Sequence, residues 1–251
     1  MMIKLNMIAF VFVLFSMMYC GPVVKDGAMG QNQKYAIETI VGNKVFSTQE
    51  GANKNIFGLL TVLFSKRSFK VKTGDITYAS APIFEKRFGN SKSFILVSNS
   101  SIKNSSPYTD VEKELGFWYR KMTLAKGYRR VTNSKKDKEI RKKIIEQNKI
   151  KGMIYVHFAT SLNIPEVGNT GDVGIVMGKV YPQVQVIIRA RDKNGKILWK
   201  DSFKKVGDIP VTIRATTVNP EEVRPLLPAV IDAAAKEAIN RLDKHIEKEK
   251  T

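Results

Sequence analysis

The chain has 251 residues, of which 43% are hydrophobic and 26% are charged. This composition is ordinary for a globular protein, and the length fits one domain or one domain with an extension. The single cysteine excludes an intrachain disulfide, so the core must hold by packing alone. The formal net charge of +19 favours anionic partners: a lipid surface, cell-wall polymers, nucleic acid or an acidic protein. A simpler explanation is a set of solvated lysines, because the basic residues are spread along the whole sequence.

The N-terminus carries an export signal. Lys4 precedes a nearly unbroken apolar run, Met7 to Met18, which is shorter than the about 20 residues of a membrane-spanning helix and is typical of a signal peptide. Its end, Met17-Met18-Tyr19-Cys20, resembles a bacterial lipoprotein signal, although the residue before the cysteine is usually small. The resemblance implies a signal peptide over residues 1–19 and acylation (palmitate) at Cys20. An ordinary signal with an incidental cysteine, or an uncleaved anchor, is the alternative.

The mature chain begins with a segment that has no period, residues 20–34, which we interpret as a flexible tether. Residues 35–251 are predicted to form a single α/β domain. Its first strands are Tyr35–Val41 and Lys44–Phe46, and Gly42-Asn43 between them predicts a hairpin turn.

The most apolar segment of the mature chain is Ile56 to Phe64. It fits a buried helix, a buried strand or a segment that touches membrane or partner, and periodicity does not separate these in so short a run. Burial in the core is the simplest interpretation. The flanking Lys54 and Lys66-Arg67 would suit an anionic membrane surface if the segment were exposed. A turn is predicted at Thr73-Gly74-Asp75.

From Phe94 the pattern is more regular. Phe94–Val97 is a continuous apolar run, typical of a strand in the middle of a covered sheet. Thr109-Asp110-Val111-Glu112 matches a capping box that opens a helix. The helix is predicted to end at Gly127 and to be followed by a strand at Tyr128–Val131. Its apolar positions step by 4, 3, 4 and 3, as on one helical face: Val111, Leu115, Trp118, Met122 and Ala125.

A second helix is predicted over 136–147 and a strand over 153–159. Residues 179–203 predict a long β-hairpin, because Asn194-Gly195 between alternating apolar residues is a strong turn signal. Residues 217–228 are proline-rich and irregular, and the last helix is predicted over 226–247. Strands that alternate with helices indicate an α/β fold with a mixed sheet covered by helices.

This order of elements resembles one group of small periplasmic α/β lipoproteins. The strand Gly127-Tyr128-Arg129-Arg130-Val131 and the hairpin from Asp192 to Trp199 carry the resemblance. The group comprises the curli-secretion channel lipoprotein, the activators of peptidoglycan synthases and the N-terminal domain of TolB. The resemblance covers residues 94–248 and implies a scaffold or partner-binding role. It leaves residues 35–93 as an N-terminal extension that contributes strands.

Catalytic motifs are missing from the sequence. Two histidines, His157 and His245, and one cysteine are too few for a zinc site with His and Cys ligands. His157 is interpreted as a packed strand residue. The glycines of the loop 166–178 precede a strand and not a helix, which excludes a phosphate-binding loop. Nothing in the sequence pairs Glu166 with Asp172 in a pocket. We therefore expect no enzyme activity, no cofactor and no metal site.

The sequence thus favours a basic, membrane-anchored lipoprotein of the cell envelope that acts as a non-catalytic binding or adaptor module. Its expected partners are the membrane, through Cys20, and an envelope protein or an anionic cell-wall or surface polymer. Nucleic acid is not expected, because the densest basic cluster, residues 135–143, has no interleaved aromatic residue. We expect the outer membrane, on its periplasmic face or at the surface, over the inner membrane. The alternatives are a subunit of an oligomeric secretion channel and a surface-exposed lipoprotein that binds anionic polymers.

Overall fold

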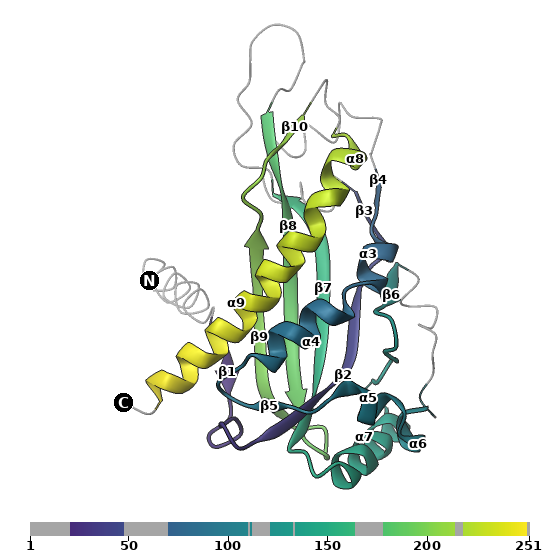
Figure 1. The fold of residues 1–251 in the computed structure, drawn as a ribbon, viewed down its shortest axis with the longest axis vertical. Coiled ribbons are helices and arrows are strands. Elements are labelled where there is room, and N and C mark those ends of the chain that lie inside the picture. Colours follow the sequence, from purple (N-terminus) through teal and green to yellow (C-terminus); the bar gives the residue numbers. More distant parts are fainter. Residues whose placement is uncertain are drawn as a thin grey trace, which may run out of the picture.

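The computed structural model describes residues 21–47, 70–109, 111, 121–132, 134–163, 178–213 and 218–249. In this part of the chain one mixed sheet has the order β1-β9-β8-β7-β2-β5, with β10 paired to β8 and β6 paired to β2 (Figure 1). Its strands are β1 (Val23–Val24), β2 (Lys34–Asn43), β5 (Ile95–Leu96), β6 (Met122–Leu124), β7 (Gly152–Asn163), β8 (Gly178–Arg191), β9 (Ile197–Val206) and β10 (Val211–Ile213). Residues 1–20, with the predicted signal peptide and Cys20, the segment Ile56–Phe64 and residues 164–177 lie outside the described residues.

The centre of the sheet is the predicted hairpin. β8 and β9 pair antiparallel from Gln183↔Val206 to Arg191↔Ile197. The turn between them contains Gly195 at φ 81°, a left-handed conformation that glycine adopts without strain. β7 pairs antiparallel with β8 and parallel with β2, which makes the sheet mixed. The predicted α/β class, the long hairpin and the C-terminal helix are confirmed.

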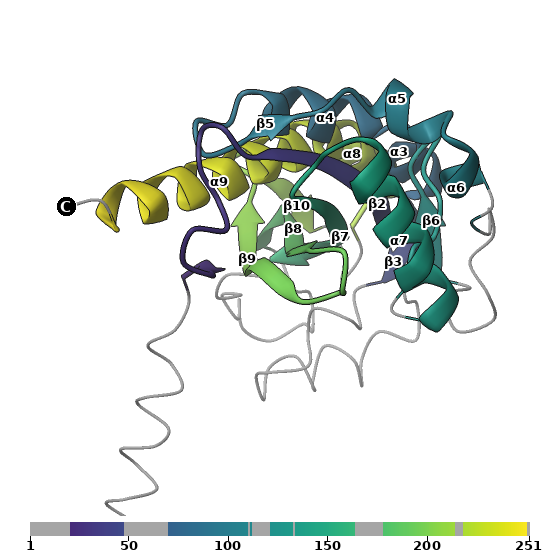
Figure 2. The same ribbon diagram turned by 90° about the horizontal axis from the view of Figure 1, so that it is seen from below.

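Two helices cover one face of the sheet: α4 (Ala81–Gly89) and α9 (Leu227–Lys248). Figure 2 shows them together on the same side of the strands. The core between helices and sheet contains Phe84, Phe88 and Trp199, all fully buried. α9 faces it with an apolar stripe at helical spacing: Leu227, Val230, Ile231, Ala234, Ala238, Ile239, Leu242 and Ile246. Helix α7 (Lys135–Gln147), as predicted, packs on the other face, where Ala36 and Met153 contact it.

The remaining elements are short. They are α3 (Gly74–Tyr78), α5 (Asn99–Lys103), α6 (Ser106–Thr109), α8 (Pro220–Val223), the 3-10 helix η3 (Arg224–Leu226), and the antiparallel pair β3 (Val45–Ser47) and β4 (Lys70–Lys72). The turn predicted at Thr73-Gly74-Asp75 is therefore the start of α3, and the irregular 217–228 contains two helical turns. None of the helices in the described ranges combines the length and the apolar character that crossing a bilayer would need.

The hairpin predicted at Gly42-Asn43 is wrong, because β2 continues through both residues. The amide of Asn43 bonds the backbone of Thr160 on β7, donating to its carbonyl at 3.0 Å and accepting from its N–H at 2.9 Å. A Cβ on Gly42 would lie 2.8 Å from the ring of Phe158. Both residues therefore serve the contact between β2 and β7, and β3 pairs with β4 instead.

Three further predictions are corrected. Met122, placed on a helix by its spacing, belongs to strand β6, since pairing with β2 overrides the local helical pattern. Tyr128–Val131 is not a strand. Phe94–Val97 forms only the two-residue β5, and it lies at the edge of the sheet and not in the middle. There Ile95 is 45% exposed.

The segment expected to be a flexible tether contacts the domain. Val23 and Val24 form β1 beside β9, and Ala28 and Met29 are buried in the main core. The hydroxyl of Tyr35 donates to the carbonyl of Ala28 at 2.6 Å. The packed domain therefore begins within three residues of Cys20.

Candidate functional site

A groove with a volume of about 760 Å³ lies beside β6, and we call it the β6 groove. Three of its described lining residues are basic and none is acidic. The lining residues are Lys44, Tyr78, Lys103, Asn104, Met122, Thr123, Leu124, Ala125, Gly127, Tyr128 and Arg129. The groove therefore combines a short strand with a positive surface.

Strand β6 is positioned by the last residues of β2, with Val41 opposite Leu124 and Asn43 opposite Met122. Backbone hydrogen bonds close both ends of the pair. Lys44 N–H donates to the carbonyl of Lys121 at 2.7 Å, and Ala125 N–H donates to that of Ile40 at 2.9 Å. Within the described ranges β2 is the sole strand partner of β6, and all three residues of β6 line the groove.

Lys103 is held by its neighbours. Its Nζ lies 2.9 Å from Glu85 Oε1 and 4.2 Å from the centre of the Tyr128 ring. The Tyr128 hydroxyl donates to the same Glu85 oxygen at 2.8 Å. Partial burial would raise the pKa of Glu85, but the hydrogen bonds from Lys103, Tyr128 and Asn99 outweigh it and hold the pKa below its usual value. Lys103 is thus neutralised in place, and Lys44 and Arg129 supply the groove's net positive charge.

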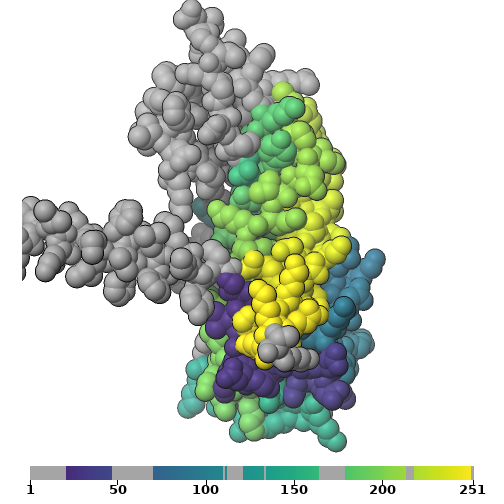
Figure 3. Space-filling model, turned by 90° about the vertical axis from the view of Figure 1, so that its left-hand side faces the viewer, coloured from purple at the N-terminus to yellow at the C-terminus, as the bar shows by residue number. Residues whose placement is uncertain are grey.

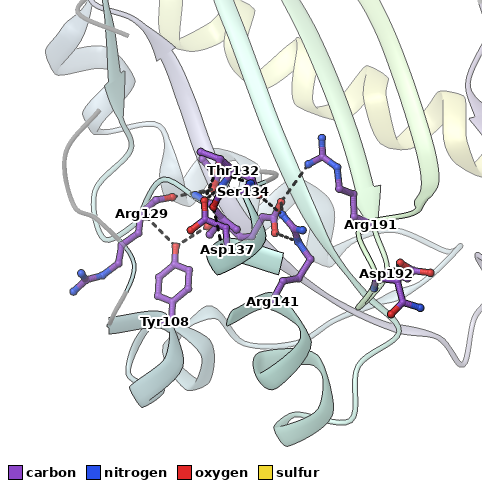
Figure 4. A network of polar contacts seen from close by, with 12 residues as sticks. Tyr108, Arg129, Thr132, Ser134, Asp137, Arg141, Arg191 and Asp192 are labelled. Atoms are coloured by element: carbon purple, nitrogen blue, oxygen red, sulfur yellow. Dashed lines mark hydrogen bonds and ion pairs between the residues drawn. The ribbon is translucent and has the colours of Figure 1, made fainter. Parts of the chain in front are cut away.

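Arg129 is fixed through its backbone. Its N–H donates to the Tyr108 hydroxyl at 2.9 Å, and its carbonyl accepts from the Thr39 hydroxyl at 2.8 Å. Tyr108 in turn donates to the carbonyl of Glu38 at 2.6 Å. Figure 4 shows the hydroxyl of Tyr108 directed toward Arg129. The guanidinium donates to the carbonyl of Val111 at 2.8 Å. The contacts with Thr39 and Glu38 tie the groove wall to β2.

A buried ion cluster lies next to this network (Figure 4). Fully buried Arg141 donates from Nε to Glu38 Oε2 at 2.7 Å and from Nη2 to the carbonyl of Thr132 at 3.0 Å. Arg191 Nη1 lies 3.6 Å from Glu38 Oε1. Burial raises the pKa of Glu38, and the two guanidiniums oppose that rise. Burial lowers the pKa of Arg191, because it disfavours the charged form of the guanidinium. The cluster joins β2, α7 and β8 and carries one more positive than negative charge.

The residues singled out by sequence are scattered. Cys20, Glu166 and Asp172 lie outside the described residues. His157 lies on β7, where burial, and then the charge of Arg189, lowers its pKa. The basic cluster 135–143 forms the outer surface of α7, except for Arg141, which points inward to Glu38. No group of His, Cys, Asp and Glu side chains that could hold a metal occurs among the residues the structure describes.

No family model matches this chain, and no curated protein matches it either. Solved structures show a weak similarity. Lipoprotein GNA1162 from Neisseria meningitidis is 12% identical over 81% of this chain and 98% of its own, with a TM-score of 0.26. A neuraminyllactose-binding hemagglutinin homolog from Helicobacter pylori is 11% identical over 87% and 84%, with a TM-score of 0.31. The protein CT253 from Chlamydia trachomatis is 11% identical over 70% and 73%, with a TM-score of 0.27. A bacterial lipoprotein is thus among the similar structures, but at these TM-scores the likeness carries no argument about function.

Proposed function

We propose that this protein is a lipid-anchored, non-catalytic binding module of the bacterial envelope, and that the β6 groove holds an acidic segment of an envelope partner. The observation that carries the proposal is the lining of the groove. Its described lining contains no carboxylate; Lys103 is paired with Glu85 behind the groove, and Lys44 and Arg129 carry the net positive charge. Such a surface attracts negatively charged partners and repels basic ones.

The lipid anchor rests on the sequence. A positive start, an apolar run and a cysteine at its end are the parts of a lipoprotein signal. The hairpin from Asp192 to Trp199, which the structure retains and which is similar to that of small periplasmic lipoproteins, favours the outer membrane and an adaptor role. The proposed address is therefore the envelope, with the domain outside the cytoplasm.

The strand that lines the groove favours an extended partner. Met122, Thr123 and Leu124 of β6 line the groove, and among the described strands β6 pairs with β2 alone, so a bound segment would add at the opposite edge of β6. A peptide that adds as a strand to such an edge bonds through its backbone and gains specificity from its side chains. Glutamate or aspartate side chains of that segment would pair with Lys44 and Arg129.

The test is binding of a glutamate-rich peptide to the mature protein, measured by fluorescence anisotropy in 0.15 M salt. We expect Lys44→Glu to weaken binding about tenfold, because it places a negative charge in the groove. Lys86→Glu on the exposed side of α4 is the matched control and should change the affinity by less than about twofold. Equal losses in both variants would show nonspecific attraction, and absence of binding to the unmodified protein would contradict the proposal.

A further inference from the structure

One side of β8 and β9 is turned away from α4 and α9, and we call it the open sheet face. Along these strands buried residues alternate with more exposed ones, and the buried set faces the helices. The open sheet face carries Arg189 on β8 and Lys200 and Lys204 on β9. Arg189 lies opposite Lys200, and Gln185 lies opposite Lys204. Arg189 and Lys200 are therefore cross-strand neighbours, and Lys204 lies on the same face about 13 Å further along β9.

The charge of this face is unbalanced. The strands β7, β8 and β9 contain one carboxylate, Asp201. It points to the helical side, where Arg241 binds it with Nε at 2.9 Å and Nη2 at 3.1 Å. The outer surface of α7 has more lysines, but Asp137, Glu139 and Glu146 are interleaved with them. The open sheet face is thus positive without acidic neighbours on its own strands.

The start of the mature chain is attached to this face. Val23 lies opposite Lys200 and Val24 opposite Trp199, and the N–H of Lys25 donates to the carbonyl of Leu198 at 2.9 Å. Val24 packs against the core, so Val23 projects on the side of Lys200, where it is 54% exposed. Figure 3 shows this edge, with the purple start of the described chain beside the yellow α9.

Covalent geometry then limits how far the domain can move from its anchor. Only Gly21 and Pro22 separate Cys20 from Val23. Three residue steps span at most about 11 Å when fully extended. Since Val23 is fixed beside Lys200, a lipid on Cys20 would hold the edge of the open sheet face within about 11 Å of the headgroups, a distance comparable to the Debye length of about 8 Å in 0.15 M salt.

We propose that the open sheet face lies against the anionic surface of the bilayer, with Arg189, Lys200 and Lys204 over lipid phosphates and Val23 at the interface. The inference rests on the lipid anchor of the proposed function, and it adds the orientation of the domain relative to the membrane. β6 pairs with β2, whereas β1 pairs with β9 at the other edge of the sheet (Figure 1). In this orientation the lipid and the β6 groove are at opposite edges, so the groove stays accessible to a partner.

The first experiment measures how strongly the open sheet face binds lipid vesicles when no anchor is present. The mature chain from residue 20 with Cys20→Ala is sedimented with vesicles of phosphatidylcholine alone, or mixed with phosphatidylglycerol, in 0.15 M salt. We expect binding only to the mixed vesicles, and a loss of at least about tenfold in the partition coefficient for Lys200→Glu/Lys204→Glu, since each basic residue near such a surface contributes about fivefold. Lys86→Glu/Lys236→Glu, on the helices that cover the other face, makes the same change in net charge and should reduce binding less than about threefold. Equal loss in both pairs would overturn the proposal.

The second experiment measures how the domain is oriented on the bilayer when a lipid anchor is attached. The only cysteine of the chain allows coupling of Cys20 to a maleimide lipid in the mixed vesicles. Lysine acylation followed by mass spectrometry should then show Lys200 and Lys204 protected and Lys236 reactive. Equal reactivity would overturn the orientation and leave the anchor untouched. Mass spectrometry of the native protein tests the anchor separately. If Cys20 carried no lipid, the anchor of the proposed function would be contradicted, and the first experiment would still test whether the open sheet face binds anionic lipid.

Discussion

At the scale of single residues, the fold depends on a carboxylate that is enclosed with two guanidiniums. Glu38 and Arg141 have no solvent exposure, and Arg191 approaches the same carboxylate from β8. Removal of ions from water is unfavourable, and the mutual attraction of the three groups, with the hydrogen bond from Arg141 to the carbonyl of Thr132, compensates for it. Deleting one partner should therefore be far more damaging than deleting a partner of a surface pair.

We expect Glu38→Gln to reduce the free energy of unfolding by about 3–5 kcal/mol, because it leaves Arg141 and Arg191 buried without a counter-charge. Urea unfolding followed by circular dichroism measures this. Glu146→Gln is the matched control, since Glu146 pairs with Lys193 at 3.4 Å where both side chains are about half exposed. It should change the stability by less than about 1 kcal/mol. Similar values for the two variants would contradict a structural role of the buried cluster.

His157 predicts a pH dependence. Burial, and then Arg189, lowers its pKa in the folded state below the usual 6.5. The unfolded chain therefore binds more protons, so the histidine's contribution to stability is complete above pH 6.5 and is lost as the pH falls below it. Urea unfolding between pH 7.5 and 5 should show this loss, and His157→Gln should diminish it. A pH dependence that persists in His157→Gln would assign it to other groups.

At the scale of elements, the helices α4 and α9 stabilise the sheet by packing their apolar side chains against it. Phe88 on α4 is fully buried, with its ring centre 6.3 Å from that of Trp199 and 6.0 Å from that of Phe84. We expect Phe88→Ala to lower the free energy of unfolding by about 3–5 kcal/mol, because it removes apolar contacts and leaves a cavity. Phe88→Leu keeps most of the volume and should cost about 1.5 kcal/mol or less. Equal losses, measured by chemical denaturation, would show that packing at this position is not specific.

The elements that the sequence predicted correctly are those with a strong local signal. β7, β8, β9, α7 and α9 each have a periodic pattern long enough to fix their type. α4 escaped the sequence analysis although Ser80, Pro82 and the spacing of Ala81, Phe84 and Phe88 are a helix signal, since two turns give few repeats of the pattern. β6 was mistaken for a helix because its partner, the end of β2, is about eighty residues away and invisible to a local pattern.

The candidate site was less predictable than the fold. Lys44, Lys103 and Arg129 are distant in sequence and meet only because β2, α5 and the segment after β6 converge. No spacing marks them in advance. The sequence placed Arg141 in the basic cluster 135–143, and only the structure reveals that its side chain turns inward to Glu38. The proposed lipidation signal, by contrast, is recognised from the sequence alone, because such a signal is a local pattern of residues.

At the scale of the molecule, the proposed anchor and the proposed membrane face predict different behaviour of one variant. A lipid anchor of two or more acyl chains gives stable attachment that salt does not reverse, because it rests on apolar burial. Attraction of Arg189, Lys200 and Lys204 to anionic lipid is screened once the Debye length falls to about 3 Å at 1 M salt. The two contributions can therefore be separated by a salt wash.

We expect the native protein to remain in washed membranes at 1 M salt and to be extracted by detergent as a monomer that carries lipid mass on Cys20. The Cys20→Ala variant, produced as the mature chain, should bind anionic membranes at low salt and leave them at 1 M salt, because only charge attraction remains. Retention of the variant at 1 M salt would contradict Cys20 as the anchor and would direct attention to Ile56–Phe64. A large, defined oligomer of the native protein would instead favour a channel-like assembly over a binding module, since an adaptor needs no ring of subunits.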